Sequence, residues 1–406
     1  MKKIIKSLIF TGSSETFSKV SGVILFLYYY KILPKDITGA LLILYSLMLT
    51  FWILIDLGSS LYGTKLIAAS EEQEWDDIQI LLTKARLFMA LIFSVGFVGY
   101  ALIYLYEYKT IAYIFAANLV MKSICADWRM KGEMRFKELS GILTTASLVL
   151  LVSGLLVGFT QQANYASIPW LLSTLIVVIL SLKRTLKWQR MTEILKWKPK
   201  EIIHCINGSK NYAISNGFSA VVQQSPILVL GLYLSTDDLA SYALIHRIVI
   251  SATFSVQMLG NVIYPWITKN HGTAPSDTLY KTINAVKVAG IITTLATVIT
   301  VATFVSTGLK EMIFTDISNY ILILFSMYFV FRATRVIVAR YMLATSLVSF
   351  YSVASALQAV LIAIAYVILG AFEYSSKENI TLIFMLNEAI LLSILGLKIS
   401  KIKYEY

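Results

Sequence analysis

The sequence has few charged residues for its length. Only 14% of its 406 residues are Asp, Glu, Lys or Arg, whereas 57% are hydrophobic, and the mean hydropathy is +0.73. Soluble globular domains carry about 25% charged residues, so this composition excludes an ordinary soluble domain. The apolar runs are long enough to cross a hydrocarbon core of roughly 30 Å as helices, and they lack the alternation of barrel strands. We therefore expect an all-α integral membrane protein.

Cysteine and histidine are also scarce. The two cysteines, Cys125 and Cys205, form no Cys-x-x-Cys pair, and the three histidines have no metal-binding spacing. The chain has no Walker A, Gly-x-Ser-x-Gly or His-Glu-x-x-His motif. We therefore expect no enzyme activity, no disulfide, no metal and no cofactor. Any transport would use a gradient, and coupling to H⁺ or Na⁺ stays open.

Twelve apolar segments are candidates to span the membrane. They are residues 7–32, 38–62, 87–106, 111–125, 139–159, 168–182, 212–234, 239–267, 283–305, 317–342, 347–369 and 380–399. The connections on one side of this arrangement carry most of the Lys and Arg residues, which makes that side cytoplasmic. The net charge of +12 is spread over these connections and not gathered in a soluble domain, so we expect no nucleic-acid partner. We predict a multi-pass protein with both termini in the cytoplasm.

One basic segment divides the chain into two halves. Residues 187–208 interleave aromatic and aliphatic residues with Lys and Arg, as an amphipathic helix at a membrane surface does. Each half starts similarly, because "SETFSKV" from Ser14 aligns without gaps on "SNGFSAV" from Ser215. Repeated bundles around a central site are common in transporters. We predict two six-helix bundles, 1–186 and 209–406, around a central cavity and joined by a cytoplasmic linker.

Charges inside the predicted helices are the first functional candidates. Glu15 and Lys19 lie one turn apart in the first segment, where a charge facing lipid costs about 3 kcal/mol or more. We expect both side chains to face the protein interior, with Lys19 near the bilayer middle and able to pair with Glu15. Arg247, in the eighth segment, is a second deep cation. A buried pair that only holds helices together is the structural alternative for Glu15 and Lys19.

Other polar residues extend the candidate set. Arg332 and Arg335 share a face of the tenth segment, where they line a cavity or anchor the helix at the inner interface. Asp56 either caps or bends the helix end before Gly58 or binds an ion, and Glu388 is a further deep acid. Uncharged polar residues of the seventh segment can serve sugar hydroxyls or helix contacts: Asn216, Gln223 and Gln224.

Four segments, in this order, resemble one family of transporters. They are "LPKDITGALLILYSLMLTFWILIDLGSS", "ADWRMKGEMRF", "PILVLGLYLSTDDLASYALIHRI" and "NVIYPWITK". Together they resemble the bacterial O-antigen and polysaccharide flippases of the Wzx type, within the multidrug/oligosaccharidyl-lipid/polysaccharide exporter superfamily. Asp127-Trp128 followed by Gly132-Glu133 is similar to the D-W-x-x-x-G-x-E turn of that family.

The resemblance implies a substrate and a location. Such flippases move an oligosaccharide linked to undecaprenyl pyrophosphate, an O-antigen repeat unit of lipopolysaccharide or a capsule repeat unit, across the bacterial inner membrane to its outer leaflet by alternating access. Polysaccharide polymerase and glycosyltransferases would then be partners, beside the lipid-linked substrate and membrane lipid.

The resemblance also implies roles for the charged candidates. In this interpretation Lys19 and Arg247 hold the diphosphate, with Arg332 and Arg335 as further cavity cations, and Glu15 holds Lys19 between cycles. The remaining candidates would line the cavity or couple an ion: Asp56, Asn216, Gln223, Gln224 and Glu388.

A second function stays open beside the flippase. A cation-coupled multidrug antiporter of the same superfamily would use Glu15, Asp56 and Glu388 to bind H⁺ or Na⁺ and an organic cation. A membrane polymerase or glycosyltransferase is disfavoured, because it would need a large outward loop and every outward connection here is short.

Overall fold

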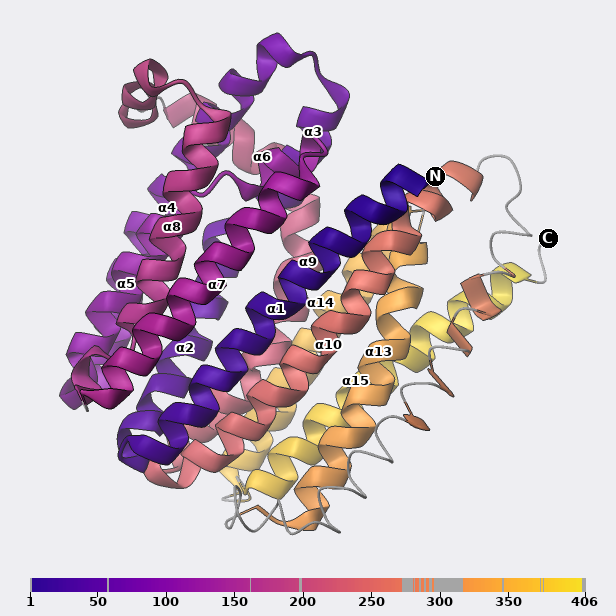
Figure 1. Cartoon of the computed structure of the whole chain (residues 1–406). Coiled ribbons are helices and arrows are strands. Elements are labelled where there is room, and N and C mark those ends of the chain that lie inside the picture. Colours follow the sequence, from indigo (N-terminus) through magenta and orange to yellow (C-terminus); the bar gives the residue numbers. More distant parts are fainter. Residues whose placement is uncertain are drawn as a thin grey trace. The chain divides into compact units, whose positions relative to one another are not determined.

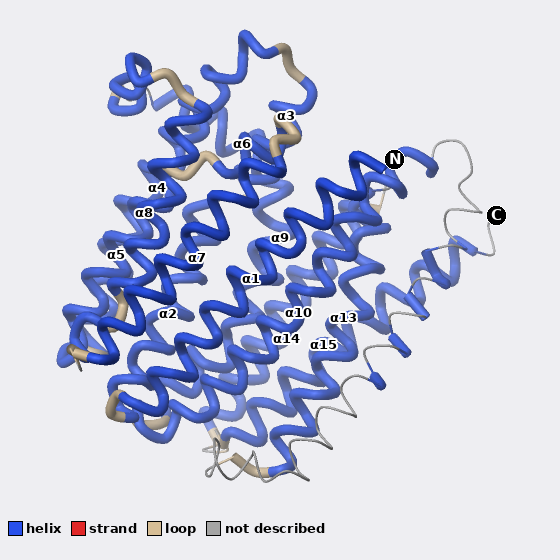
Figure 2. Tube along the Cα trace, viewed as in Figure 1, coloured by secondary structure: helices blue, strands red, loops and turns tan. Residues whose placement is uncertain are grey.

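A computed structural model gives the structure of the chain (Figure 1). The structure describes residues 2–56, 58–160, 162–196, 199–271, 317–344, 347–372, 374 and 376–403, and isolated residues between 280 and 295. Every regular element in these ranges is helical, as Figure 2 shows. The prediction of an all-α protein is confirmed.

The helices overlap the predicted spans, although α4 begins at Trp75 and α9 at Pro199, well before the predicted starts at 87 and 212. Their bounds are α1 Lys2–Ile32, α2 Lys35–Asp56, α3 Ser59–Ala69, α4 Trp75–Tyr104, α5 Lys109–Ser123, α6 Asp127–Gly132, α7 Phe136–Phe159, α8 Ile168–Thr185, α9 Pro199–Tyr233, α10 Thr236–His271, α13 Asn319–Ala344, α14 Val348–Ala371 and α15 Lys377–Lys403. Short 3₁₀ helices are Glu72–Glu74, Tyr106–Tyr108, Ala163–Tyr165 and η4, Trp188–Leu195. Eight helical segments of the described chain are long and apolar enough to cross a membrane. Most of the predicted ninth span, 283–305, lies outside the described residues.

The predicted second span is interrupted. We expected one helix over residues 38–62, but α2 ends at Asp56 and α3 begins at Ser59. Gly58 adopts φ 68°, a left-handed conformation that suits glycine because it has no Cβ. Hydropathy averaged over the whole segment does not detect this break, because Asp56, Ser59 and Ser60 are few beside the apolar residues around them.

Packing divides the chain into two compact units. Unit 1 contains Met1–Gln224 and Ser235–Ala240, and unit 2 contains Ser225–Leu234 and Ser241–Tyr406. These units are defined by packing, and the sequence-based bundles 1–186 and 209–406 stay a prediction. The predicted amphipathic linker is η4 followed by the first turns of α9.

Close contacts fix α1 within unit 1. Gly154 and Gly158 of α7 lie one turn apart, and a Cβ added to either would collide with the side chain of Leu25 or Tyr28. Small residues at this spacing let two membrane helices approach closely. The ring of Trp170 also packs on Phe26 of α1, with ring centroids 4.8 Å apart. These contacts hold the helix that carries Glu15 and Lys19.

Unit 2 has its own core. Helix α13 packs against α15 and, less extensively, against α14. Toward one end, Tyr328 stacks on Phe384 with ring centroids 4.1 Å apart. Toward the other, Met342 and Leu395 are fully buried in a shared apolar cluster. The polar residues of unit 2 described below lie along these three helices.

Candidate functional site

The break between α2 and α3 places Asp56 against a buried arginine of α4. The Asp56 carboxylate pairs with the Arg86 guanidinium and accepts hydrogen bonds from Ser60 Oγ at 2.7 Å and from the Ser60 backbone N–H at 3.4 Å. Arg86 is 1% exposed and also donates to Ser59 Oγ at 2.6 Å and to the Cys125 carbonyl at 3.2 Å. Asp56 therefore caps the first turn of α3 and balances Arg86. A part for Asp56 in ion coupling stays a prediction.

A second group of charges joins α1 to the short helix α6. Lys131 Nζ lies 3.3 Å from Glu15 Oε1 and 3.5 Å from Asp127 Oδ2. The side chains of Lys131, Glu15 and Asp127 are 36%, 30% and 32% exposed, so none of the three is enclosed by the protein. Ion pairs exposed to this extent contribute about 0–1 kcal/mol, which makes them easy to exchange. Glu15, which the sequence places one turn from Lys19, thus contacts a lysine of another helix, α6.

Two more lysines belong to the same region of unit 1. Lys122 lies in the last turn of α5, and its Nζ is 4.5 Å from the centroid of the Trp52 ring of α2. The charges of Lys19, Asp127 and Asp56 act on the Lys122 ammonium. Among the described residues, no carboxylate forms an ion pair with Lys122. The five neighbouring charges are called the lysine cluster below: Glu15, Lys19, Lys122, Asp127 and Lys131.

The Glu15 contact fixes the position of Lys19 along α1. Helix α6 connects the end of α5 to the start of α7, so Glu15 lies level with one end of these helices. Lys19 is one turn, about 6 Å, further along α1. Helix α1 begins at Lys2, about 20 Å before Glu15. Lys19 therefore lies near the end of the neighbouring helices that α6 connects, and its position near the bilayer middle stays a prediction.

The Asp-Trp motif builds the platform that presents Lys131. Trp128 is 1% exposed, and its carbonyl oxygen accepts a hydrogen bond from Thr64 Oγ1 of α3 at 2.9 Å. A Cβ on Gly63 would lie 2.5 Å from the Trp128 ring, and a Cβ on Gly132 would lie 2.7 Å from Ile67 Cβ. Tryptophan and glycine, one turn apart, therefore form the face of α6 that packs on α3. The spacing of the motif has a structural cause.

Arginines anchor the other side of α6. Arg129 donates to Asp76 Oδ1 at 2.7 Å and to Gln79 Oε1 at 2.6 Å, both on α4, and to Glu133 Oε1 at 2.5 Å. Glu133 also accepts a bond from Arg135 at 3.0 Å. The final glutamate of the D-W-x-x-x-G-x-E pattern is thus held between two guanidinium groups. This network fixes α6 against α4, and so fixes the lysine that α6 carries.

In unit 2, three sequence candidates come together in one closed group. Glu388 of α15 accepts hydrogen bonds from Arg335 Nε and from Gln358 Nε2, the latter at 3.2 Å, and lies 3.5 Å from Arg332 NH1. Arg335 also donates to the Tyr351 hydroxyl at 3.1 Å. The side chains of Arg335 and Glu388 are only 2% and 1% exposed. These residues of α13, α14 and α15 are called the arginine cluster below: Arg332, Arg335, Tyr351, Gln358 and Glu388.

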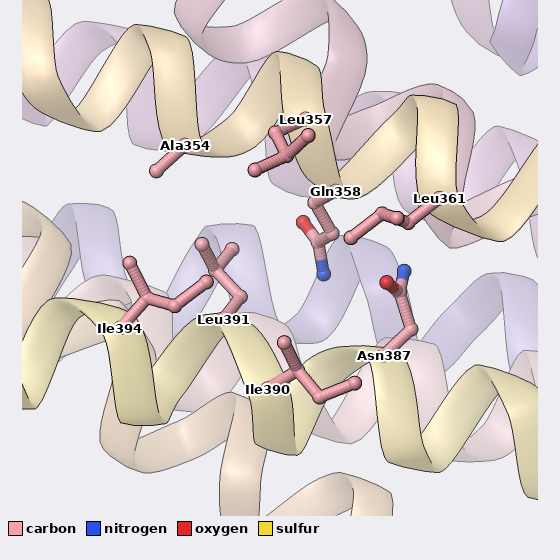
Figure 3. Close-up of a pocket in the computed structure, with 8 residues that line it drawn as sticks. All are labelled: Ala354, Leu357, Gln358, Leu361, Asn387, Ile390, Leu391 and Ile394. Carbon is pink, nitrogen blue, oxygen red and sulfur yellow. The ribbon is translucent and has the colours of Figure 1, made fainter.

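A small recess lies beside the arginine cluster, between α14 and α15 (Figure 3). Gln358 and Asn387 point toward each other across it. Gln358 Oε1 and Asn387 Nδ2 have no hydrogen-bond partner among the described residues. The volume of the recess, about 10 Å³, is room for one water molecule and far too small for a sugar or a phosphate. We assign it no ligand.

The remaining candidates are placed as follows. Arg247 of α10 is 4% exposed and belongs to unit 2, whereas Lys19 belongs to unit 1, so their joint action stays a prediction. Gln223 and Gln224 of α9 are buried. Asn216 lies in the same helix, but its side chain is outside the described part. Within the described ranges, no group of His, Cys, Asp or Glu side chains could hold a metal ion.

Sequence inspection missed Arg86, Lys122 and Lys131 as members of polar clusters. All three lie in or next to the basic connections of the chain, and that position does not show what they contact. Lys122 and Asp127 flank the turn between α5 and α6. Their closeness in the sequence was the only indication that they could belong to one cluster. The contact between Lys131 and Glu15 joins residues more than a hundred positions apart, so no local pattern could reveal it.

Comparison with known proteins gives one family and several related structures. The model of the family described as "Polysaccharide biosynthesis protein" matches residues 4–271. Comparison with curated protein sequences gives no significant match.

The related structures show the fold. The chain is similar to an inward-facing multidrug resistance MATE family transporter of the MOP superfamily, with a TM-score of 0.68 and 13% identity over 98% of this chain and 99% of the other. A mutant of the Vibrio cholerae MATE transporter VcmN aligns with a TM-score of 0.62 and 13% identity over 100% and 98% of the two chains. The lipid II flippase MurJ aligns with a TM-score of 0.65 and 12% identity over 97% and 87%. The chain therefore has the fold of MOP-superfamily transporters.

Proposed function

Because the chain belongs to the polysaccharide biosynthesis protein family, we propose that it is a flippase for an oligosaccharide linked to undecaprenyl pyrophosphate. The family match over residues 4–271 is the observation that carries this proposal. The related structures include MurJ, a flippase for lipid II. A transporter fold with this family membership fits movement of a lipid-linked sugar and requires no chemical step.

The lysine cluster supports a phosphate-bearing cargo. A diphosphate carries negative charge on each phosphate, and bringing it into a medium of low dielectric constant requires nearby positive charge. Lys19, Lys122 and Lys131 outnumber Glu15 and Asp127, so the cluster has a net positive charge. In the proposed cycle, the diphosphate binds here from the cytoplasmic leaflet and the lipid tail stays in the bilayer. An O-antigen or capsule repeat unit would then reach the outer leaflet of the inner membrane by alternating access.

The carboxylates argue against the multidrug antiporter. An antiporter for organic cations needs acidic side chains that are free to bind them. Glu15 pairs with Lys131, Asp56 with Arg86, and Glu388 with Arg332 and Arg335. All three acids that could serve an antiporter are therefore already balanced by cations within their own units.

Deletion and reconstitution test the function. Deleting the gene should stop surface polysaccharide and leave lipid-linked repeat units on the cytoplasmic leaflet, and the purified protein in proteoliposomes should move a fluorescent undecaprenyl-pyrophosphate oligosaccharide between leaflets. Empty liposomes are the control. Unchanged surface glycan together with new sensitivity to cationic dyes would favour the antiporter. Polymerase and glycosyltransferase partners would be sought by crosslinking in the native membrane.

Labelling of single cysteines tests the orientation. In a chain whose Cys125 and Cys205 are replaced by Ser, Asp237→Cys at the start of α10 should react with an impermeant maleimide from outside. Lys196→Cys, directly after η4, should react only after permeabilisation. The reverse pattern would overturn the proposal that both termini are cytoplasmic.

A further inference from the structure

Unit 1 contains a lysine that its neighbours do not neutralise. Lys122 Nζ lies over the Trp52 ring, and the neighbouring charges act on it without forming an ion pair among the described residues. Its place in the last turn of α5 is favourable, because the carbonyl end of a helix attracts a cation. The ring covers one side of the ammonium and leaves its other N–H groups available. Burial and the charge of Lys19 nevertheless disfavour the charged form of Lys122, so an anion bound there would stabilise the ammonium.

Lys131 lies in the same cluster but is occupied. Glu15 and Asp127 approach its ammonium to 3.3 and 3.5 Å from two different helices. Asp127 is also close enough for its charge to act on Lys122. The two carboxylates offer anionic oxygen acceptors to the lysine ammonium groups, and the two phosphates of a diphosphate offer acceptors of the same kind.

We propose that Lys122 and Lys131 bind the lipid diphosphate together with Lys19, and that Glu15 and Asp127 occupy this site until the substrate displaces them. This inference rests on the proposed function, whose substrate carries the same diphosphate group. The exchange replaces one anion with another at Lys131, so Lys131 keeps a counter-charge at every stage. Exposure of about a third of each side chain at Glu15, Asp127 and Lys131 gives the incoming group access.

The exchange has a mechanical consequence. The Glu15–Lys131 pair connects α1 to α6, whereas α6 itself is fixed to α3 and α4 by Trp128 and Arg129. When a phosphate takes the place of Glu15 at Lys131, that connection between α1 and the fixed platform is lost. Substrate binding would thus loosen one attachment of α1 while leaving α6 in place.

Direct binding tests this assignment with a sugar-free probe. Undecaprenyl pyrophosphate would be titrated into the full-length protein in nanodiscs, and the wild type should bind it. Lys122→Met and Lys131→Met should each weaken binding about tenfold or more, because each removes a charge-assisted contact. The matched control is Lys109→Met at the opposite end of α5, where the lysine donates to the Tyr106 hydroxyl and lies over the same ring, and it should bind as the wild type does.

A variant with the opposite sign separates binding from structure. Glu15→Gln removes the competing carboxylate, so it should tighten binding of the same probe several-fold. A purely structural role for the Glu15–Lys131 pair predicts unchanged or weaker binding instead. If Lys122→Met fails to fold, two other variants still test the assignment. Lys122→Arg should retain binding of the probe, and Glu15→Gln should strengthen it. Unchanged affinity in Glu15→Gln and in both Met variants would overturn the assignment.

The controls distinguish this inference from the flippase itself. Inorganic pyrophosphate that competes with the lipid identifies the diphosphate as the recognised group, whereas competition by undecaprenol alone would overturn the lysine site. If the wild-type protein flips the oligosaccharide and both Met variants also flip and bind normally, only this inference is refuted. A wild type that neither binds the probe nor flips the oligosaccharide would refute the proposed function as well.

Discussion

The lysine cluster of unit 1 and the arginine cluster of unit 2 contain the same kinds of charge in different arrangements. In the arginine cluster, one carboxylate accepts hydrogen bonds from a planar guanidinium and an amide and forms an ion pair with a second arginine, and all of these side chains are buried. In the lysine cluster, ammonium and carboxylate groups meet at 3.3–3.5 Å and remain about a third exposed. Arginine forms fixed, forked contacts, whereas lysine is a point charge on a flexible chain. We interpret the first cluster as a fixed structural connection and the second as an exchangeable site.

The largest expected effect is on the stability of unit 2. Glu388→Gln would leave Arg332 and Arg335 buried without a carboxylate, which typically costs about 3–5 kcal/mol. We expect a large loss of folded protein, measured by fluorescence-detected size exclusion and thermal unfolding in detergent. Glu378→Gln, at the start of the same helix, is the control, since Glu378 accepts one bond from Ser318 and should cost about 1 kcal/mol. A Glu388→Gln protein that is stable but inactive would contradict a structural role for the arginine cluster and favour ion coupling at Glu388.

A loss of transport without a loss of protein is expected in unit 1. Lys19→Ala should reduce surface glycan per inserted protein molecule by about tenfold or more, because a charged contact to the diphosphate is removed. Lys19→Arg should keep part of the activity, since the charge remains and the geometry changes. Full export per inserted molecule by the Lys19→Ala variant would show that Lys19 does not bind the diphosphate.

The platform under Lys131 should tolerate little change. Gly132→Ala would place a Cβ 2.7 Å from Ile67 Cβ and 3.0 Å from the Thr64 carbonyl oxygen. Such overpacking costs about 1–3 kcal/mol, so the melting temperature and the affinity for undecaprenyl pyrophosphate should both fall. Gly141→Ala in α7 is the matched control, because a Cβ there has nothing within 4 Å. Equal melting temperatures for the two variants would show that α6 does not need its close contact with α3.

The smallest expected effect is a difference in salt dependence. Because the Debye length falls from about 10 Å at 0.1 M to about 3 Å at 1 M salt, binding of the diphosphate lipid to the exposed lysine cluster should weaken several-fold over that range. The destabilisation caused by Glu388→Gln should change much less, since the arginine cluster is shielded from solvent ions. An equal salt response in the two measurements would contradict the distinction between exposed and closed clusters.

Sequence patterns predicted the helices better than they predicted the roles of charges. The predicted segment 139–159 became α7, Phe136–Phe159, because a long apolar run has no other way to satisfy its backbone in a membrane. Arg332 and Arg335 share a face of the predicted helix, where the sequence left cavity lining and anchoring at the interface equally open. The structure gives them a shared carboxylate, Glu388, from a helix more than fifty residues away. Only the packing of α13 against α15 could show this pairing.

The sequence by itself determined that this is an all-helical membrane protein and which family it resembles, because both follow from local composition and from motifs read in order. The Asp-Trp motif was also visible, but its reason was not: Trp128 and Gly132 face α3, and that contact depends on how the chain turns at Gly58. Tertiary structure alone decided that Glu15 of α1 contacts Lys131 of α6 and that the charge of Lys19 acts on Lys122. Charges act through space, so their partners are set by the packing of helices and not by their order in the chain.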